Sequence, residues 1–469
     1  MAERAGSTLR PGGGRVRGPV DVPRLAAFEV LKAVRVDDAY ANLVLPAVIA
    51  HFNLEARDAA FTTELASGTL RWRGTYDAVL SACVDRPLSK VEAKVLDALR
   101  LGTHQLLAMR VPTHAAISTT VDLVRATGNQ GAAGFANAVL RKVAAHDLDA
   151  WVARVAPDPT SLRYPEVALS HPAWVVDELR KAVGPDQLLA LLAADNVAPE
   201  VTLVARPGRA TREELPGEPT PYSPYGVTLT GGSPAAVPAV AEGRAGVQDE
   251  GSQLVALALA RAEVPAEGSD GDGGRWVDLC AGPGGKAALL AALAAERGAS
   301  LLAVERAPHR ARLVARSLAD LRGTGGFAGI VVADGRRPPL TPGTADRVLV
   351  DAPCTGLGAL RRRPESRWRR RPDDLLELVL LQRALLASAV DLLRPGGVVV
   401  YATCSPVLAE TSGVVTSLLE NRSDVVLEDV GALLPEVPDA AGPLPGTLQL
   451  WPHRHGTDAM FVALLRRSP

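Results

Sequence analysis

The 469-residue chain has only four cysteines, few aromatic residues and no long apolar run. The cysteines are Cys83, Cys280, Cys354 and Cys404, and no two of them have CxxC spacing. No histidine stands near them at a zinc-ligand interval, so we expect no metal site. A disulfide framework belongs to small secreted chains, which excludes that class of protein. The four cysteines are therefore expected to be free thiols in a reducing compartment.

The sequence also lacks a secretory signal and a membrane span. The first 24 residues contain arginine and glycine but no apolar segment of the kind found in a signal peptide. No apolar run approaches the ~18 to 20 residues that a membrane span requires. The formal net charge is -1, so any contact with nucleic acid must come from local patches. We expect a cytoplasmic protein with no membrane partner.

Changes in the apolar pattern divide the chain into four parts. Residues 1–22 are rich in Gly, Arg and Pro and predict a flexible basic tail, and residues 23–147 repeat apolar side chains at helical intervals. Residues 148–246 continue with helix candidates and then turn rich in Pro and Gly around a short strand candidate, VTLVA. We expect a helical linker and a small α+β subdomain there, with a disordered linker as the alternative.

Residues 247–469 alternate continuous apolar strands with helices. This pattern predicts an α/β domain with a doubly wound, Rossmann-like parallel sheet buried on both faces. LQLWPH and AMFVALLRR close the chain as a further pair of strand candidates. The expected fold is thus multidomain: an all-helical domain, a small α+β subdomain and an α/β domain.

Polar residues mark the carboxyl ends of the first four strands of the α/β domain. The first strand runs from Asp278 into the Gly-rich turn CAGPGGK and then into a helix. Such a turn lets a ligand approach the backbone and the free N–H groups of the helix. The next strands end at Glu305, Asp334 and Asp351, and an acid such as Glu305 can accept hydrogen bonds from both ribose hydroxyls of a nucleoside. The series favours a nucleoside-type cofactor over a purely structural turn.

Two thiols follow the fourth and fifth strands, in DAPCTG and TCSP. Cys354 and Cys404 would face one crevice if their strands adjoin, because neighbouring strands lie ~4.8 Å apart. A thiolate that adds to C6 of a pyrimidine makes C5 reactive enough to accept a methyl group. A redox pair and buried structural thiols are the alternatives. For Cys83, within a helical pattern, and for Cys280, within the Gly-rich turn, packing roles are expected.

An arginine-rich run follows Cys354. Residues 361–371 contain seven arginines around Trp368. Arginines suit phosphate contacts and a tryptophan ring can stack on an unpaired base. The run favours a nucleic-acid contact, with a solvated charged face as the alternative.

Several of these motifs resemble those of one enzyme family. DLCAGPGGK, DAPC and TCSP, with QDEGSQ at 248–253, resemble the RNA 5-methylcytosine methyltransferases. In the helical part, FTTELASGTLRWRGTYD, LRLGTHQLL, MRVPTHAAI and FANAVLRK look like the NusB-like domain of one subgroup. That subgroup is the bacterial 16S rRNA (cytosine-C5) methyltransferases of the RsmB/Sun type. The resemblance covers about residues 23 to 467.

The resemblance implies a role for each matching residue. Cys404 would attack C6 of a cytosine in 16S rRNA, and Cys354 would assist proton removal and release of the product. S-adenosyl-L-methionine would be the cofactor. The residues that would bind it are Cys280, Ala281, Gly282, Pro283, Gly284, Gly285, Lys286, Glu305, Arg310, Asp334 and Asp351. Lys286 and Asp351 would also hold the cytosine.

The resemblance also implies the partners and the domain functions. Residues 23–147 would be an RNA-binding NusB-like domain, residues 148–246 would include an RNA-binding subdomain, and residues 247–469 would be the methyltransferase domain. The RNA would be naked or partly assembled, and the protein would act as a monomer. The same chemistry on tRNA or another RNA, and a non-catalytic RNA-binding assembly factor, are the alternatives.

The chain departs from the family pattern at three places. Gly282 stands where alanine is usual, a change expected to be harmless. The strand in VTLVARP is not followed by the usual asparagine, which bears on how RNA docks. Met460 replaces a usual aromatic residue after the Thr457-Asp458 pair.

Overall fold

A computed structural model describes residues 20–128, 131–265 and 274–469 of the chain. Most of the expected basic tail and of the segment GSDGDGGR therefore lies outside the described residues. The chain forms two compact units. The helical unit comprises Met1–Asp177, Asp186–Ala198 and Leu360–Arg369, and the sheet unit comprises Glu178–Pro185, Pro199–Ala359 and Arg370–Pro469. Each unit has its own hydrophobic core.

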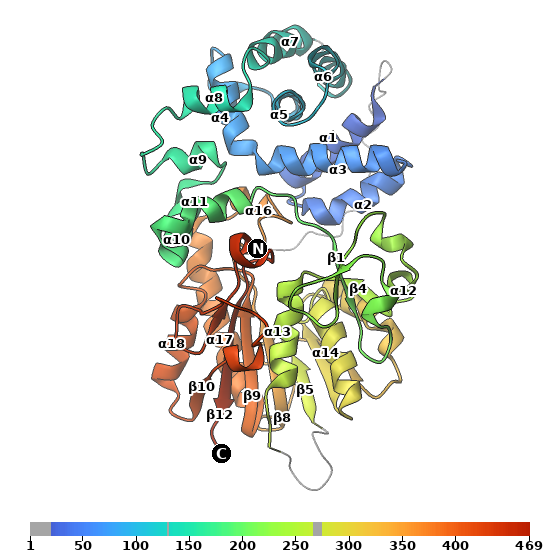
Figure 1. Ribbon diagram of the computed structural model, residues 1–469, viewed down its shortest axis with the longest axis vertical. Coiled ribbons are helices and arrows are strands. Elements are labelled where there is room, and N and C mark those ends of the chain that lie inside the picture. Colours follow the sequence, from blue (N-terminus) through green and yellow to red (C-terminus); the bar gives the residue numbers. More distant parts are fainter. Residues whose placement is uncertain (1–19, 129–130, 266–273) are drawn as a thin grey trace. The chain divides into compact units, whose positions relative to one another are not determined.

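The helical unit is built around α5, which lies among the other helices (Figure 1). Almost every side chain of α5 from Val95 to Gln105 is buried, as expected for a helix covered on all sides. Its neighbours are amphipathic, and Asp21 caps α1 by accepting a hydrogen bond from the Arg24 N–H. The helices are α1 Val22–Val36, α2 Ala41–His51, α3 Ala56–Arg71, α4 Arg73–Cys83, α5 Ala93–Leu107, α6 Thr113–Thr127, α7 Ala132–Val143, α8 Leu148–Val155, α9 Tyr164–Ala168, α11 Pro185–Ala194 and α16 Ser366–Arg369, with the 3-10 turn η1 Leu88–Lys90. Helix α10 Ala173–Val183 spans the division between the units. The predicted all-helical domain is confirmed.

Part of the arginine-rich run is buried within the helical unit. The Arg367 side chain is 0% exposed and donates to the carbonyls of Ser170 and Asp195 and to Asn196 Oδ1. Burial lowers the pKa of its guanidinium to about 9. Arg361 is buried as well. The expected nucleic-acid contact is therefore wrong for Arg361 and Arg367, because a buried guanidinium is not available to a phosphate.

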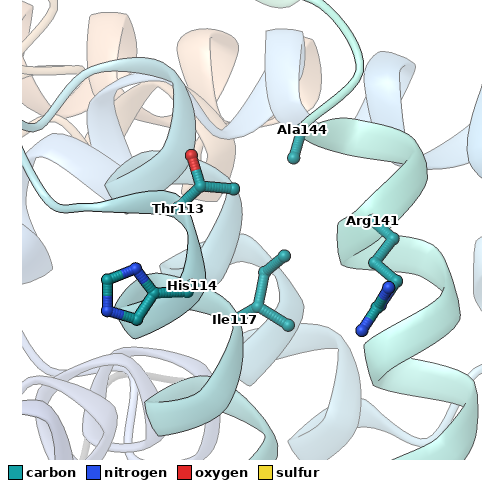
Figure 2. Close-up of a pocket in the computed structure, with 5 residues that line it drawn as sticks. All are labelled: Thr113, His114, Ile117, Arg141 and Ala144. Atoms are coloured by element: carbon teal, nitrogen blue, oxygen red, sulfur yellow. The ribbon is translucent and has the colours of Figure 1, made fainter.

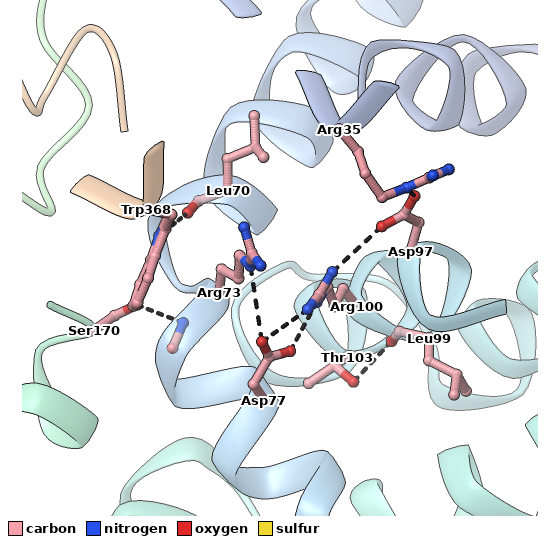
Figure 3. A network of polar contacts seen from close by, with 11 residues as sticks. Arg35, Leu70, Arg73, Asp77, Asp97, Leu99, Arg100, Thr103, Ser170 and Trp368 are labelled. Carbon is pink, nitrogen blue, oxygen red and sulfur yellow. Dashed lines mark hydrogen bonds and ion pairs between the residues drawn. The ribbon is translucent and has the colours of Figure 1, made fainter. Parts of the chain in front are cut away.

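The Trp368 side chain also contacts residues of the helical unit (Figure 3). Its indole Nε1 donates to the Leu70 carbonyl (3.2 Å), and the Arg73 guanidinium lies 5.7 Å from the ring centroid. Arg73 in turn begins a series of ion pairs through Asp77 and Arg100. The Trp368 ring is thus held by protein groups, and the sequence-based prediction that it stacks on a base is not supported.

The sheet unit contains a mixed sheet in the strand order β10-β12-β9-β8-β5-β6-β7, with β11 paired to β12. The five strands from β9 to β7 along this order are parallel, and β12 and β10 run antiparallel beside them. The strands are β5 Arg275–Asp278, β6 Ser300–Glu305, β7 Phe327–Val332, β8 Ala345–Asp351, β9 Leu393–Thr403, β10 Val425–Glu428, β11 Leu448–Gln449 and β12 Phe461–Arg467. The predicted α/β fold and the final strand pair are confirmed.

Helices cover both faces of this sheet, with α13 and α14 on one face and α17 and α18 on the other (Figure 1). The alternation of side chains along a strand explains this: Leu349 packs toward α13 and α14, whereas Val348 and Val350 pack toward α17 and α18. The helices and turns are α13 Glu250–Arg261, α14 Gly285–Glu296, α15 Pro308–Ser317, η4 Ala319–Leu321, α17 Pro372–Leu392, α18 Ser412–Asn421, η5 Gly431–Leu433 and α19 Pro452–His455. Burial on both faces accounts for the continuous apolar strands.

A second, small antiparallel sheet in the order β2-β3-β1-β4 precedes α13. Its elements are β1 Thr202–Ala205, η2 Arg212–Glu214, β2 Glu218–Pro219, β3 Gly226–Thr228, η3 Pro234–Ala236, α12 Pro238–Ala241 and β4 Ala245–Val247. The ordered strands favour the α+β subdomain over the disordered linker. Arg206, at the position where the usual asparagine is missing, is buried and pairs with Asp320 Oδ1 (2.8 Å). The Arg206 side chain, which stands in place of the usual asparagine, therefore joins the small sheet to η4.

No helix in the parts of the chain that the structure describes is long and apolar enough to cross a membrane. Within those same parts, no group of His, Cys, Asp and Glu side chains could hold a metal ion.

Candidate active site

The candidate site lies at the carboxyl edge of the parallel strands. From β5 the chain adds β6 and β7 on one side, and then β8 and β9 on the other. The order of the strands therefore reverses between β5 and β8, where ligands bind in open α/β sheets. The expected site residues follow five neighbouring strand ends, with the Gly-rich turn after β5 and the two thiols after β8 and β9. The adjacency that the thiol hypothesis required is present, because β8 pairs with β9.

The Gly-rich turn is held from two sides by the next βα unit. The Gly282 N–H donates to Glu305 Oε2 (3.0 Å), and Arg310 Nη2 donates to the Gly282 carbonyl (2.6 Å). Gly284 has a φ of 115°, a backbone conformation that favours glycine. Helix α14 begins at Gly285 with no side-chain cap on its first N–H groups. The turn thus leaves helix N–H groups available to a ligand.

The departure at Gly282 has a structural consequence. A Cβ added at this position would clash with Glu305 Oε2 and lie 2.9 Å from Arg310 Nε. In this conformation, glycine is what lets the Glu305 carboxylate approach the backbone of the turn. Glu305 Oε2 and Arg310 Nε both belong to flexible side chains that can shift to make room for a methyl group, so the expectation that the change from alanine is harmless stays a prediction. Ala281 is buried beneath the turn, and the Pro283 carbonyl accepts a hydrogen bond from Ser317 Oγ (3.3 Å).

The acids at the strand ends differ in their surroundings. Asp334, which follows β7, forms a paired contact with Arg336, whose hydrogen bonds lower the Asp334 pKa to about 2. Asp278 ends β5 fully buried, and its Oδ2 has no hydrogen-bond partner. Burial, followed by the charge of Asp351, raises the Asp278 pKa to about 7. Asp278 was the first residue of the cofactor motif in the sequence but was not among the expected site residues.

The two expected thiols lie side by side. Cys354 Sγ is 3.4 Å from Cys404 Sγ. The contact with Cys404, then burial, then the neighbouring charges including that of Glu410 hold the pKa of the Cys354 thiol well above its ordinary value. Cys354 therefore keeps its proton when Cys404 is ionised. A thiol beside a thiolate is an arrangement that can donate or accept a proton at one point in a reaction.

Lys286 connects the cofactor turn to the thiols. Its Nζ lies 2.8 Å from Asp351 Oδ2, at the end of β8. Burial alone would lower the pKa of Lys286, but the Asp351 carboxylate and then Cys404 raise it above its ordinary value. The attraction is mutual, because an ammonium group near a thiol favours the thiolate. Lys286 thus places a positive charge where it favours ionisation of Cys404.

The other two cysteines show the surroundings of packing residues. Cys83 is buried in α4 of the helical unit, and burial raises the pKa of its thiol. Burial and then the nearby acids, led by Asp278, hold the pKa of the Cys280 thiol well above its ordinary value. Both thiols therefore stay neutral and poorly reactive.

Glu410 is a further residue that reasoning from the sequence missed. It lies between β9 and α18, is 0% exposed and accepts hydrogen bonds from residues next to both thiols. In the sequence, a lone glutamate in a loop after a strand carries no signal of this role. Only its position six residues after Cys404 was available.

An open depression of about 700 Å³ lies elsewhere, on the helical unit between α6 and α7 (Figure 2). Its lining consists of Thr113, His114, Ile117, Arg141 and Ala144. These residues include no thiol and no acid. The depression therefore has none of the groups that a covalent methyl transfer needs.

Comparison with known proteins assigns the two ends of the chain. Residues 269–466 match the family described as 16S rRNA methyltransferase RsmB/F, and residues 21–145 match the NusB family. A protein of Mycobacterium tuberculosis whose name goes no further than a methyltransferase is 51% identical, over 96% of this chain and 98% of its own length. The ribosomal RNA small subunit methyltransferase B of Pseudomonas syringae is 32% identical, over 94% of this chain and 96% of its own length.

Solved structures agree on the fold. The structure of PH0851 has a TM-score of 0.78 at 24% identity and covers 96% of this chain and 100% of its own. The structure of NSun6 from Pyrococcus horikoshii with SFG has a TM-score of 0.53 at 18% identity and covers 64% of this chain and 98% of its own. Taken with the thiols, the Gly-rich turn and the NusB-family helices, the matches to the family models and to the sequence relatives show that the chain is an S-adenosylmethionine-dependent methyltransferase and belongs to the RsmB/F family of 16S rRNA methyltransferases.

Proposed function

We propose that this protein methylates C5 of a cytosine in 16S rRNA, through a covalent bond between Cys404 Sγ and C6 of the base. The observation that carries the proposal is the pair of thiols, with sulfurs 3.4 Å apart, at the sheet edge that also holds the cofactor turn. Methyl transfer to oxygen or nitrogen needs no thiol. Transfer to C5 of a pyrimidine does need one, because that carbon is too weak a nucleophile until a group adds at C6.

The residues around the Gly-rich turn fit S-adenosylmethionine. Glu305 and Arg310 hold the Gly282 backbone at the turn, and the buried Asp278 Oδ2 is an acceptor without a donor. Glu305 at the end of β6 would accept hydrogen bonds from ribose hydroxyls, and Asp334 lies at the next strand end. When bound, this cofactor supplies a methyl group on a positively charged sulfur. Cys280 to Lys286, Glu305, Arg310, Asp334 and Asp351 would hold it.

The protein side chains then act in sequence on the base. Lys286 favours the Cys404 thiolate, which forms a bond to C6 and makes C5 a nucleophile. Lys286 and Asp351 would hold the cytosine. After C5 accepts the methyl group, it must lose its proton, and the C6–sulfur bond then breaks as the double bond re-forms. Once Cys404 is bonded to C6 it carries no charge, so Cys354 can lose its own proton to solvent and accept the C5 proton as a thiolate. Cys404 then leaves C6 as a thiolate.

The target RNA is tested by bisulfite sequencing of rRNA from cells with and without this protein. We expect one 16S rRNA cytosine to resist conversion only when the protein is present, because C5 methylation blocks deamination. If the cells without this protein instead lose a methylated cytosine in tRNA, the substrate of the same reaction is tRNA. An unchanged methylation pattern in every RNA would favour a non-catalytic assembly factor that binds RNA through the helical unit.

Glu305→Gln is expected to weaken S-adenosylmethionine binding roughly 10- to 100-fold, or about 1.4 to 2.8 kcal/mol. The amide keeps the shape of the side chain but replaces one acceptor oxygen with a donor, which faces the Gly282 N–H or the ribose. Calorimetric titration of the cofactor into the purified chain measures the change. Glu296→Gln is the matched control, because Glu296 is exposed at the other end of α14. Equal affinities of Glu305→Gln and the unmodified chain would contradict the assignment of Glu305.

A further inference from the structure

Two loops must be held together for the thiols to meet. Cys354 lies in the loop after β8, and Cys404 lies directly after β9. Hydrogen bonds between the strands stop at the sheet edge, so the ladder alone does not fix the two loops. One backbone connection does join them: the Gly358 N–H donates to the Cys404 carbonyl (2.9 Å). That bond holds the far end of the Cys354 loop, four residues beyond the thiol.

Close to the thiols, a buried carboxylate joins the loops, beside a direct contact of 3.0 Å between Thr355 Oγ1 and Ser405 Oγ. Glu410 Oε1 accepts a hydrogen bond from the Thr355 N–H (2.8 Å), and Oε2 accepts from Thr355 Oγ1 (2.5 Å). The same Oε2 accepts from Ser405 Oγ (2.6 Å). Thr355 directly follows Cys354, and Ser405 directly follows Cys404. The carboxylate thus contacts the residue next to each thiol.

The Glu410 carboxylate is itself held in place. Gln382 Nε2, on α17, donates to Glu410 Oε1 (2.9 Å) and to the carbonyl of Pro353, the residue before Cys354 (2.8 Å). The Tyr401 hydroxyl, on β9, donates to the Glu410 backbone carbonyl (2.7 Å). The Gln382, Tyr401 and Glu410 side chains are all buried. The position of the carboxylate is therefore determined by the same strand and helix that carry the two loops.

We propose that Glu410 is a positioning residue for the methyl transfer: it joins the Cys354 and Cys404 loops so that both thiols face the same base. The proposal rests on the proposed function, since it assigns the two thiols to one reaction. A carboxylate suits this position because all four of its contacts come from donors, which an ionised carboxylate accepts without offering a proton.

Glu410→Gln tests the proposal, because the amide keeps the length of the side chain but presents an NH2 group to one pair of donors. We expect kcat to fall roughly 100-fold, as for reacting groups misplaced by about 1 Å. The KM for RNA and the affinity for S-adenosylmethionine should stay within about twofold. A second readout needs no RNA: phenylarsine oxide bridges two thiols that lie close together, with loss of water, and intact mass spectrometry follows the product. Capture should be at least about tenfold slower in Glu410→Gln.

Glu250→Gln is the matched control. Glu250 is also buried and accepts hydrogen bonds from the Tyr222 and Ser223 N–H groups, but none from a residue next to a thiol. We expect it to capture the arsenical at the rate of the unmodified chain. Equal loss of capture in both variants would overturn the proposal, since it would show general loosening of the unit. So would a Glu410→Gln variant with unchanged kcat and unchanged capture.

If Glu410→Gln does not fold, Glu410→Asp gives the test in the folded protein, because the shorter carboxylate cannot reach both loops but leaves the direct contact between Thr355 Oγ1 and Ser405 Oγ (3.0 Å) in place. Slower capture and a lower kcat in Glu410→Asp support the proposal, and unchanged values of both overturn it. The arsenical also separates this inference from the proposed function. A chain that captures the arsenical in the Glu410-dependent manner but never methylates cytosine would refute the reaction and leave the loop connection intact.

Discussion

Cys404→Ala is expected to lower kcat for cytosine methylation by more than about 10⁴-fold. The alanine side chain has no lone pair to add to C6, so C5 stays unreactive toward the methyl group. The substitution removes a single sulfur atom from a half-buried position. Cofactor binding should therefore persist. Incorporation of labelled methyl groups into rRNA, measured beside calorimetric cofactor titration, checks both expectations.

Cys83→Ala is the control for this experiment. Cys83 is a buried thiol in α4 of the helical unit and is not one of the residues at the sheet edge. Its removal should leave the methylation rate within about twofold, provided that the helical unit stays folded. If Cys404→Ala methylated cytosine at the rate of the unmodified chain, Cys404 could not be the nucleophile, and Cys354 would be the next thiol to examine.

Cys354→Ser is expected to have the opposite signature, with bond formation to the RNA intact and release impaired. Cys354 Sγ lies 3.4 Å from Cys404 Sγ, close enough to act on the same C5–C6 bond. Without it, the C5 proton is not removed efficiently and the Cys404–C6 bond persists. The protein should then accumulate as a covalent adduct with RNA. A denaturing gel shows this as a slowly migrating band that RNase digestion removes.

The double variant Cys354→Ser, Cys404→Ala separates a true intermediate from chance cross-linking. It should give no adduct, because the nucleophile is missing. An adduct of equal amount in the double variant would place the attachment at another residue. Absence of any adduct in Cys354→Ser, under conditions where the unmodified chain turns over, would remove Cys354 from the release step.

Much of the fold follows from local patterns. The continuous apolar strands that alternate with helices predict a sheet buried on both faces, and β5, β6, β8 and β9 are arranged in this way. The helical period predicts the helical unit in the same manner. These patterns report which side chains must be buried, and burial is the largest favourable term in folding. Predictions from these patterns therefore hold even when the distant contacts are unknown.

The arginine-rich run shows where local patterns fail. Its composition is that of a nucleic-acid contact, but Arg367 is fully buried against Ser170, Asp195 and Asn196. Those partners lie more than 170 positions away in the chain. A charged side chain is stable in a protein interior only when it is paired or hydrogen-bonded, and its sequence neighbours do not reveal such partners. The charge of the run was predictable, but the burial of Arg367 was not.

By itself, the sequence determined the chemistry available to this protein: a Gly-rich turn after a strand, acids at successive strand ends and two thiols in DAPC and TCSP. Only the tertiary structure decided that the thiols meet, because the strand order that sets β8 beside β9 is a property of the whole sheet. The same holds for Glu410, whose role depends on donors from two loops and from α17. Residue types fix which reactions are possible, whereas long-range packing fixes which of those residues come within reach of one another.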